Sequence, residues 1–274
     1  MTTVIALAGK GGTGKTTMSA LLIRYLVQER SGAILAIDAD PASNLNLVLG
    51  MELQQTIGGI REDMLGQVQT SGALAGSMPG GMSKHEYLDY QVQMSLVEGE
   101  RVDLLAMGRP EGPGCYCAAN QMLRVILDRL AKQYDYVVID NEAGMEHLSR
   151  RTTRDVDVLL LVTDPTQRGL ITAKRMEEMV PELDIGVEHV YLVVNRLRGV
   201  GRDDVASPTR TEPLPEPLAA AIQEAGLDLV GTLPEEPTMA EFEFTGRPLV
   251  ELPEETDLYQ AVRGIAETIL NGQR

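Results

Sequence analysis

Tryptophan is absent from this 274-residue sequence, cysteine occurs only twice, and aromatic residues make up 4% of the chain. Two cysteines cannot build a disulfide-stabilised scaffold. Hydrophobic residues make up 43% of the chain, which indicates a globular protein. Because so few of them are aromatic, the core must be built from Leu, Ile, Val, Ala and Met. The length fits one large α/β domain as easily as two small ones, and it is ample for a buried core.

A surplus of positive charge is also missing. The 24 basic residues are outnumbered by 40 acidic ones, which gives a net charge of -16. Without a basic stripe, we expect no nucleic-acid partner and no binding to an anionic membrane surface. Every apolar run is shorter than the roughly 18 residues that a membrane span needs, and the first residues lead into a strand without a signal peptide. We therefore expect a cytoplasmic protein.

The best-defined motif is the glycine-rich segment Gly9–Thr17, with the sequence GKGGTGKTT. It follows an apolar run of strand length, Thr3–Ala8, and precedes a helical pattern, Met18–Gln28. The spacing GxxxxGK[ST] between a strand and a helix predicts a P-loop that binds a nucleoside triphosphate. The alternative, a glycine-rich turn that contains Lys-Thr by chance, fits this context poorly.

Each part of this loop has an expected role. Its glycines allow backbone N–H groups to point at phosphate oxygens, next to the positive end of the following helix. Lys15 is expected to reach the terminal phosphates, and the Thr16 hydroxyl to coordinate Mg²⁺. The expected nucleotide-binding residues here are Gly9, Gly11, Gly12, Thr13, Gly14, Lys15, Thr16 and Thr17.

A second lysine in the loop, Lys10, is not required by an ordinary P-loop. With it, GKGGTGKTT resembles the deviant Walker A motif of the family that includes nitrogenase iron protein, MinD, ParA and the nickel-insertion ATPases. The resemblance implies a homodimer in which Lys10 reaches across to the partner's nucleotide and acts in catalysis. From the loop sequence alone, Lys10 would be interpreted as a solvated surface lysine.

Two acidic residues, Asp38 and Asp40, end the apolar run Ala33–Asp38 and precede a proline. In an open parallel sheet, ligands bind at this end of the strands. Asp38 can therefore hold Mg²⁺ through a water or contact Lys15, and Asp40 can orient the water that attacks the γ-phosphate. The structural alternatives are a solvated acid at the strand end for Asp38 and a helix N-cap for Asp40. The DxDP pattern matches the first switch segment of the family.

A third acidic residue, Asp140, closes the apolar run Asp135–Asp140. A hydrophobic run that ends in Asp has the form of a Walker B segment, so Asp140 is a candidate for the magnesium shell. Gly144 follows as a candidate for a backbone turn that senses the γ-phosphate.

The two cysteines form a Cys-x-Cys motif, Cys115 and Cys117. In an extended segment, residues i and i+2 point the same way, so both thiols are presented together, and a disulfide between them would be strained. Two thiolates are half of what tetrahedral Zn²⁺ requires, and a two-fold dimer would supply four. The alternative, two ordinary buried cysteines, fits the glycine- and proline-rich loop near 108–118 less well.

The segments GCYCAAN, at 114–120, and DNEAGMEHLSR, at 140–150, resemble the CooC-type accessory ATPases. The resemblance implies that the cysteine pairs of two subunits bind nickel or zinc at the dimer interface. It also implies a client, the apo-enzyme of nickel carbon monoxide dehydrogenase or of acetyl-CoA synthase. Glu142 and His147 belong to this narrower resemblance without an assigned role; His147 can be a second metal ligand or a helix-surface or capping histidine.

The family resemblance also implies the residues that contact the base. Asn195 matches an adenine-contacting Asn, Arg196 flanks the base, and the loop of Leu233, Pro234 and Glu235 wraps adenine by main chain. Guanine-specific GTPases use an NKxD arrangement. Because its acidic residue is missing here, the sequence favours ATP and ADP.

Strands alternate with helices over most of the chain. This pattern predicts a doubly wound, mainly parallel sheet of seven or more strands flanked by helices, the P-loop NTPase fold. We expect one domain over 1–274 with a mobile insertion of helices and loops near 54–95. The expected strands are Thr3–Ala8, Ala33–Asp38, Val102–Ala106, Asp135–Asp140, Asp157–Thr163, His189–Asn195 and Leu229–Leu233.

Taken together, these features predict an ATP-hydrolysing metallochaperone that dimerises and delivers nickel. One rival is a spatial regulator of the MinD or ParA kind, which the acidic charge and the plain last helix disfavour. A second rival is a redox ATPase similar to nitrogenase iron protein. That protein takes its two cluster cysteines from distant segments, whereas these two lie in one loop.

Overall fold

The computed structural model describes residues 2–60, 81–108, 125–145, 155–183, 185–198 and 214–272. Seven strands form one sheet in the order β3-β2-β4-β1-β5-β6-β7, and every neighbouring pair is parallel. The strands are β1 (Thr3–Ala8), β2 (Ile34–Asp38), β3 (Val102–Ala106), β4 (Tyr136–Asp140), β5 (Asp155–Thr163), β6 (Gly186–Leu197) and β7 (Leu229–Pro234). The predicted fold class is confirmed.

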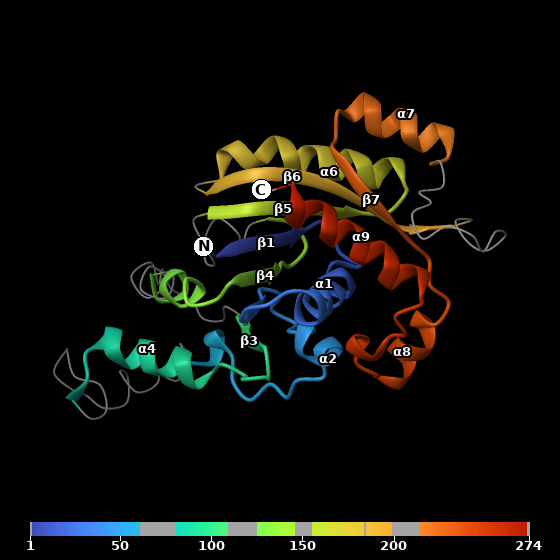
Figure 1. The fold of residues 1–274 in the computed structure, drawn as a ribbon. Helices are drawn as coiled ribbons and strands as arrows, with labels where there is room; N and C mark the ends of the chain where they lie inside the picture. The colour runs from blue at the N-terminus through green and yellow to red at the C-terminus, as the bar shows by residue number, and fades with distance from the viewer. Residues whose placement is uncertain are drawn as a thin grey trace.

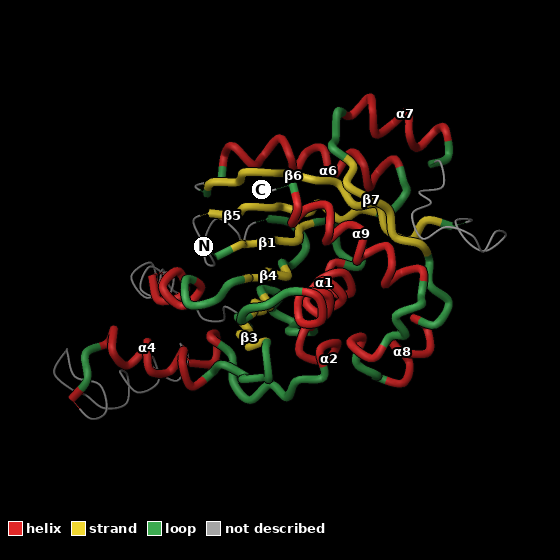
Figure 2. Tube along the Cα trace, viewed as in Figure 1, coloured by secondary structure: helices red, strands yellow, loops and turns green. Residues whose placement is uncertain are grey.

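Helices cover both faces of this sheet, as Figure 1 shows. Their apolar residues divide into two cores, one with α1 and α9 and the other with α6 and α7. Figure 2 shows the same layers by type of secondary structure. The helices are α1 (Lys15–Glu29), α2 (Leu45–Leu49), α4 (Lys84–Met94), α6 (Gln167–Met179), α7 (Glu216–Ala225), α8 (Met239–Thr245) and α9 (Asp257–Asn271), with 3-10 turns at Val180–Glu182 and Leu249–Glu251.

Strand β1 illustrates why the sheet is buried on both sides. Successive side chains of a strand point to opposite faces. Val4 and Ala6 accordingly enter one core and Ile5 and Leu7 the other. Such strands read as continuous apolar runs, which is typical of parallel sheets. The two cores therefore sit on either side of the strand that leads into the P-loop.

The boundaries of several elements differ from the predicted ones, and two of these differences have a clear cause. Helix α1 begins at Lys15 rather than at Met18, because Gly14 adopts a left-handed φ of 89° and the helix starts directly after it. Strand β6 extends beyond its predicted range at both ends, from Gly186 to Leu197, because it pairs with β5 from Gly186 onward and with β7 up to Leu197.

Part of the predicted insertion near 54–95 is described. It contains helical residues 57–60 and α4. Helix α4 begins with a capping box in which Ser83 and Glu86 bond each other's backbone N–H groups. This reciprocal cap explains why the helix starts where it does. The remainder of the insertion lies outside the described residues, so its predicted mobility stays a prediction.

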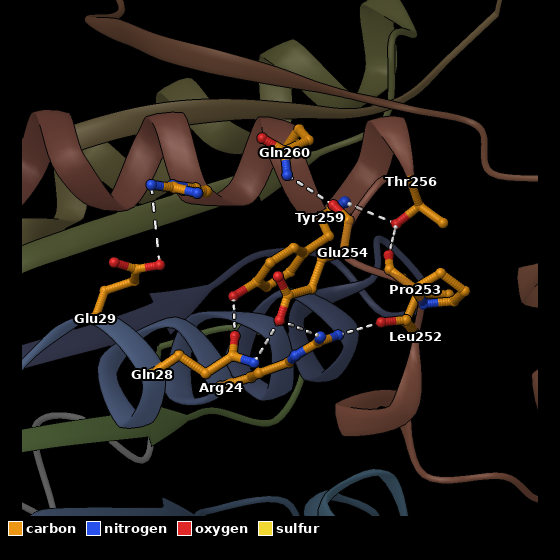
Figure 3. Close-up of polar contacts among 10 residues, drawn as sticks. Arg24, Gln28, Glu29, Leu252, Pro253, Glu254, Thr256, Tyr259 and Gln260 are labelled. Atoms are coloured by element: carbon orange, nitrogen blue, oxygen red, sulfur yellow. Dashed lines mark hydrogen bonds and ion pairs between the residues drawn. The ribbon is translucent and has the colours of Figure 1, made fainter. Parts of the chain in front are cut away.

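A buried arginine on α1, drawn in Figure 3, contacts the last helix and the segment before it. Arg24 is only 9% exposed and donates hydrogen bonds to the Leu252 carbonyl and to Glu254. Its guanidinium also lies 4.3 Å from the centre of the Tyr259 ring. The Tyr259 hydroxyl in turn donates to Gln28 on α1. This network holds the C-terminal segment against the helix that begins at the P-loop.

Candidate nucleotide-binding site

The predicted P-loop connects β1 to α1 at the carboxyl end of the sheet. Gly9 passes close to β5, since a Cβ on it would lie 2.2 Å from the Val162 carbonyl oxygen. Gly14 combines a φ of +89° with a close neighbour, because a Cβ there would lie 2.2 Å from Asn195 Nδ2. Glycine at these positions is thus required by packing as well as by the loop's conformation.

Lys15 lies inside the loop and is 8% exposed. Its Nζ donates to the carbonyl oxygens of Gly9 and Lys10, both at 3.3 Å. Burial lowers the pKa of Lys15, while the charges of Asp140, Asp40 and Glu142 oppose that shift. A lysine held by loop carbonyls close to these acids is placed to pair with phosphate oxygens.

Asp140, at the end of β4, is 1% exposed, and each of its carboxylate oxygens accepts a hydroxyl hydrogen. Thr16 donates to Oδ2 at 2.6 Å and Ser19 donates to Oδ1 at 3.1 Å. Burial raises the pKa of Asp140 to about 6, against the two hydroxyl bonds and the charge of Lys15. The predicted Walker B residue, Asp140, therefore contacts the helix that follows the P-loop, α1.

Ser19 was not among the predicted site residues. It follows Thr16 by three positions, and residues i and i+3 share one face of a helix. That spacing was the available signal, although it cannot say which carboxylate the two hydroxyls meet.

Asp38 ends β2 beside Asp140 and is 0% exposed. Its Oδ1 accepts the N–H of Asp40 at 3.0 Å and its Oδ2 accepts the N–H of Leu45 at 2.9 Å. Burial is the largest cause that raises the pKa of Asp38 to about 7, and repulsion from Asp140 and Asp40 adds to it. The alternative of a solvated strand-end acid is therefore wrong.

Asp40 is half-buried, and its Oδ1 accepts the N–H of Ala42 at 2.8 Å. The residue that precedes α2 is Asn44 rather than Asp40. Asp40 is therefore not the N-cap of this helix. Its charge acts on Lys15 and on the carboxylates of Asp38 and Asp140, so the loop places Asp40 close to these groups.

The segment after β4 is attached to the P-loop strand at two points. The Gly144 N–H donates to the Gly9 carbonyl oxygen at 3.1 Å. Asn141, which the sequence analysis did not single out, donates from Nδ2 to the Leu7 carbonyl oxygen at 2.8 Å. Asn141 is buried, and its Oδ1 has no partner among the described residues. The predicted γ-phosphate-sensing turn at Gly144 thus starts in contact with the P-loop.

The predicted base-binding residues lie where β6 and β7 end. Asn195 Nδ2 donates to the Thr13 carbonyl oxygen at 2.8 Å, which joins β6 to the P-loop. The Glu235 N–H donates to the Leu197 carbonyl oxygen at 3.2 Å. These bonds bring both predicted base-binding segments to the same edge of the sheet as Lys15.

Lys10 lies exposed on the P-loop. Its carbonyl oxygen accepts from Thr13 Oγ1 and from Lys15 Nζ. Within the part of the chain that the structure describes, its ammonium has no hydrogen-bond or ion-pair partner. The side chain is therefore available to an external anion.

The predicted metal-binding residues Cys115 and Cys117 lie outside the described residues, as does His147. Among the described residues, no group of three or more His, Cys, Asp or Glu side chains could hold a metal ion. No helix in those same ranges is long and apolar enough to cross a membrane.

A family model, the CobQ/CobB/MinD/ParA nucleotide binding domain, matches residues 4–249. An uncharacterized ATP-binding protein of Methanocaldococcus jannaschii is 44% identical over 268 residues, which are 98% of each chain. The carbon monoxide dehydrogenase accessory protein CooC of Rhodospirillum rubrum is 32% identical over 208 residues, 70% of this chain and 74% of that protein.

Solved structures share the fold over the whole chain. The septum site-determining protein MinD of Pyrococcus horikoshii, complexed with Mg-ADP, is similar with a TM-score of 0.65 and 23% identity. The match covers 100% of this chain and 98% of the MinD chain. MinD of Pyrococcus furiosus gives a TM-score of 0.66 at 23% identity, with 100% of both chains covered.

Proposed function

The chain belongs to the CobQ/CobB/MinD/ParA nucleotide-binding domain family, and on that premise we propose that it is an ATP-hydrolysing metallochaperone. A cytoplasmic homodimer would deliver nickel during maturation of carbon monoxide dehydrogenase or acetyl-CoA synthase. The resemblance to the wider family is confirmed, whereas the CooC-type branch and the nickel stay predictions. The observation that supports ATP hydrolysis is the arrangement at the P-loop of two buried charged residues, Lys15 and Asp140, with the Thr16 hydroxyl bonded to Asp140.

The residues at this edge fit Mg²⁺. Thr16 donates its hydroxyl hydrogen to Asp140, which leaves the lone pairs of its oxygen for a cation. Asp38 and Asp140 are buried acids on adjacent strands, and Mg²⁺ prefers oxygen ligands and carboxylates. Thr16 would hold the ion, with Asp140 and Asp38 acting directly or through water. When bound, Mg²⁺ would neutralise charge on the phosphates.

In the proposed reaction, each P-loop holds the triphosphate through its N–H groups and Lys15. Asp40 orients the water that attacks the γ-phosphate, and Arg196 and Leu233–Glu235 surround adenine. Lys10 supplies positive charge to the transferring phosphate of the second copy, which agrees with its exposed, unpaired ammonium among the described residues. Charge placed in this way stabilises the transition state.

Nickel is the proposed cargo, and the support for it is the Cys115-x-Cys117 motif together with the CooC relative. Two subunits would supply four thiolates, a set that suits a soft or borderline ion such as Ni²⁺ or Zn²⁺. Closure of the dimer around ATP would change the separation of the two cysteine pairs and so hold or release the ion.

Equilibrium dialysis of the purified protein against Ni²⁺, with and without ATP, tests this function. Wild type is expected to bind about one ion per dimer, and the variant with Cys115→Ser and Cys117→Ser is expected to bind none. Unchanged nickel binding by the variant would exclude the proposed interface site.

The second candidate is a MinD- or ParA-like spatial switch, which the MinD relatives support; MinD of Bacillus subtilis is 26% identical over 97% of this chain. The output of such a switch is binding to a membrane or to DNA. The net charge of -16 opposes both surfaces. ATP-dependent co-sedimentation with anionic vesicles or DNA would favour this candidate over the metallochaperone.

A further inference from the structure

Asn195 joins two segments that are 182 positions apart in the sequence. It is 7% exposed at the end of β6. Its Nδ2 donates to the Thr13 carbonyl oxygen at 2.8 Å, and its Oδ1 accepts the N–H of Arg196 at 2.7 Å. Because a carbonyl oxygen can only accept and a backbone N–H can only donate, these two bonds determine the orientation of the amide.

The atom that Asn195 binds, the Thr13 carbonyl oxygen, lies where the P-loop turns into α1. Thr13 is followed by Gly14, whose φ of +89° turns the chain, and by Lys15, the first residue of α1. Thr13 itself is buried, and its hydroxyl donates back to the Lys10 carbonyl oxygen at 2.9 Å. The hydroxyl and the carbonyl of Thr13 are thus both held, one within the loop and one by β6.

Packing at Gly14 strengthens this connection. A Cβ on Gly14 would lie 2.2 Å from Asn195 Nδ2, so the amide rests directly against the turn. A buried carbonyl that loses its donor bears the cost of desolvation. Without the amide, the turn between Thr13 and Lys15 would therefore be less well held, and so would the N–H groups that face the phosphates.

From this geometry we propose that Asn195 is a positioning residue of the phosphate-binding loop, and that its contribution to nucleotide binding falls on the phosphates rather than on the base. The inference rests on the proposed ATP binding and deepens it. It is separate from the prediction that Asn195 contacts adenine, because an adenine contact would affect only ligands that carry a base.

Binding of ATP and of tripolyphosphate, measured by calorimetry for wild type and Asn195→Ala, separates the two roles. A positioning role predicts that both ligands bind about tenfold more weakly, in equal proportion. Weaker binding of ATP with unchanged binding of tripolyphosphate would overturn the inference and identify a base contact. Glu188→Gln, at an exposed position near the other end of β6, is the matched control and should bind both ligands as wild type does.

Hydrogen exchange of the ligand-free protein tests the same inference without nucleotide. Amides of residues 10–17 should exchange faster in Asn195→Ala than in wild type, while those of β1 exchange at the same rate. Equal exchange of residues 10–17 in the two proteins would overturn the inference. Wild type that binds no ATP would instead refute the proposed function, and the exchange result would still decide whether Asn195 holds the loop.

Discussion

Asp38 and Asp140 are direct neighbours across the parallel ladder between β2 and β4, and both side chains are buried. They are stabilised by different donors. Asp38 accepts the backbone N–H groups of Asp40 and of Leu45, the first residue of α2, whereas Asp140 accepts two hydroxyl groups from α1. Two acids side by side in a buried site disfavour each other's charged form, and this relationship has a measurable consequence.

The stability of the ligand-free protein should fall as pH rises through this pair. Burial raises the pKa of Asp38 to about 7 and that of Asp140 to about 6, from the ordinary value of 3.8 for an aspartate. Because the native state then binds more protons than the unfolded state, the stabilisation is present below about pH 4 and is lost as pH rises through about 7. Urea unfolding without Mg²⁺, between about pH 5 and about pH 8, measures the effect.

Asp38→Asn removes one of the two titrations. Its side chain keeps only one oxygen for the two N–H groups, so it should be less stable than wild type at low pH. The difference between the two free energies of unfolding should shrink as pH rises, because only wild type has a charge to bury. A difference that stays constant over this range would contradict the prediction.

Lys10→Ala should separate ATP binding from hydrolysis. Lys10 is exposed, and its carbonyl rather than its ammonium contacts Lys15, so its removal should leave the affinity for ATP nearly unchanged. Hydrolysis should fall on the order of a hundredfold or more, as when a charge supplied in trans is removed from a phosphoryl-transfer site. Phosphate release and nucleotide binding are measured in parallel, with Lys15→Ala as a control that should lose both. Equal loss of binding and hydrolysis in Lys10→Ala would mean that it acts only within its own loop.

Arg24→Ala should destabilise the fold without touching the nucleotide edge. Arg24 loses its bond to the Leu252 carbonyl and its contact with Tyr259, which should cost about 2–4 kcal/mol. Glu254 is 62% exposed, so Glu254→Gln should cost less than about 1 kcal/mol. Thermal and urea unfolding compare the two variants. Equal costs would mean that the ion pair, rather than the buried bond and the ring contact, fastens the C-terminal segment.

The sequence predicted the seven strands well for a physical reason. Strands that are buried on both faces read as continuous apolar runs, so their existence is visible without knowing their neighbours. Their ends were less clear, as β6 shows, because β5 pairs with residues of β6 beyond its apolar centre. The P-loop was equally easy to predict, because all of its motif residues lie within nine consecutive positions, Gly9–Thr17.

By itself, then, the sequence determined the parallel fold class, the P-loop and the acids at the strand ends. Only the tertiary structure decided which groups surround those acids and support the loop. Ser19 meets Asp140 across 121 positions, and Asn195 meets Thr13 across 182. A serine or an asparagine in a sequence does not indicate which distant group it will bond. Their hydrogen bonds depend on which strands the sheet places side by side, and no local pattern encodes that arrangement.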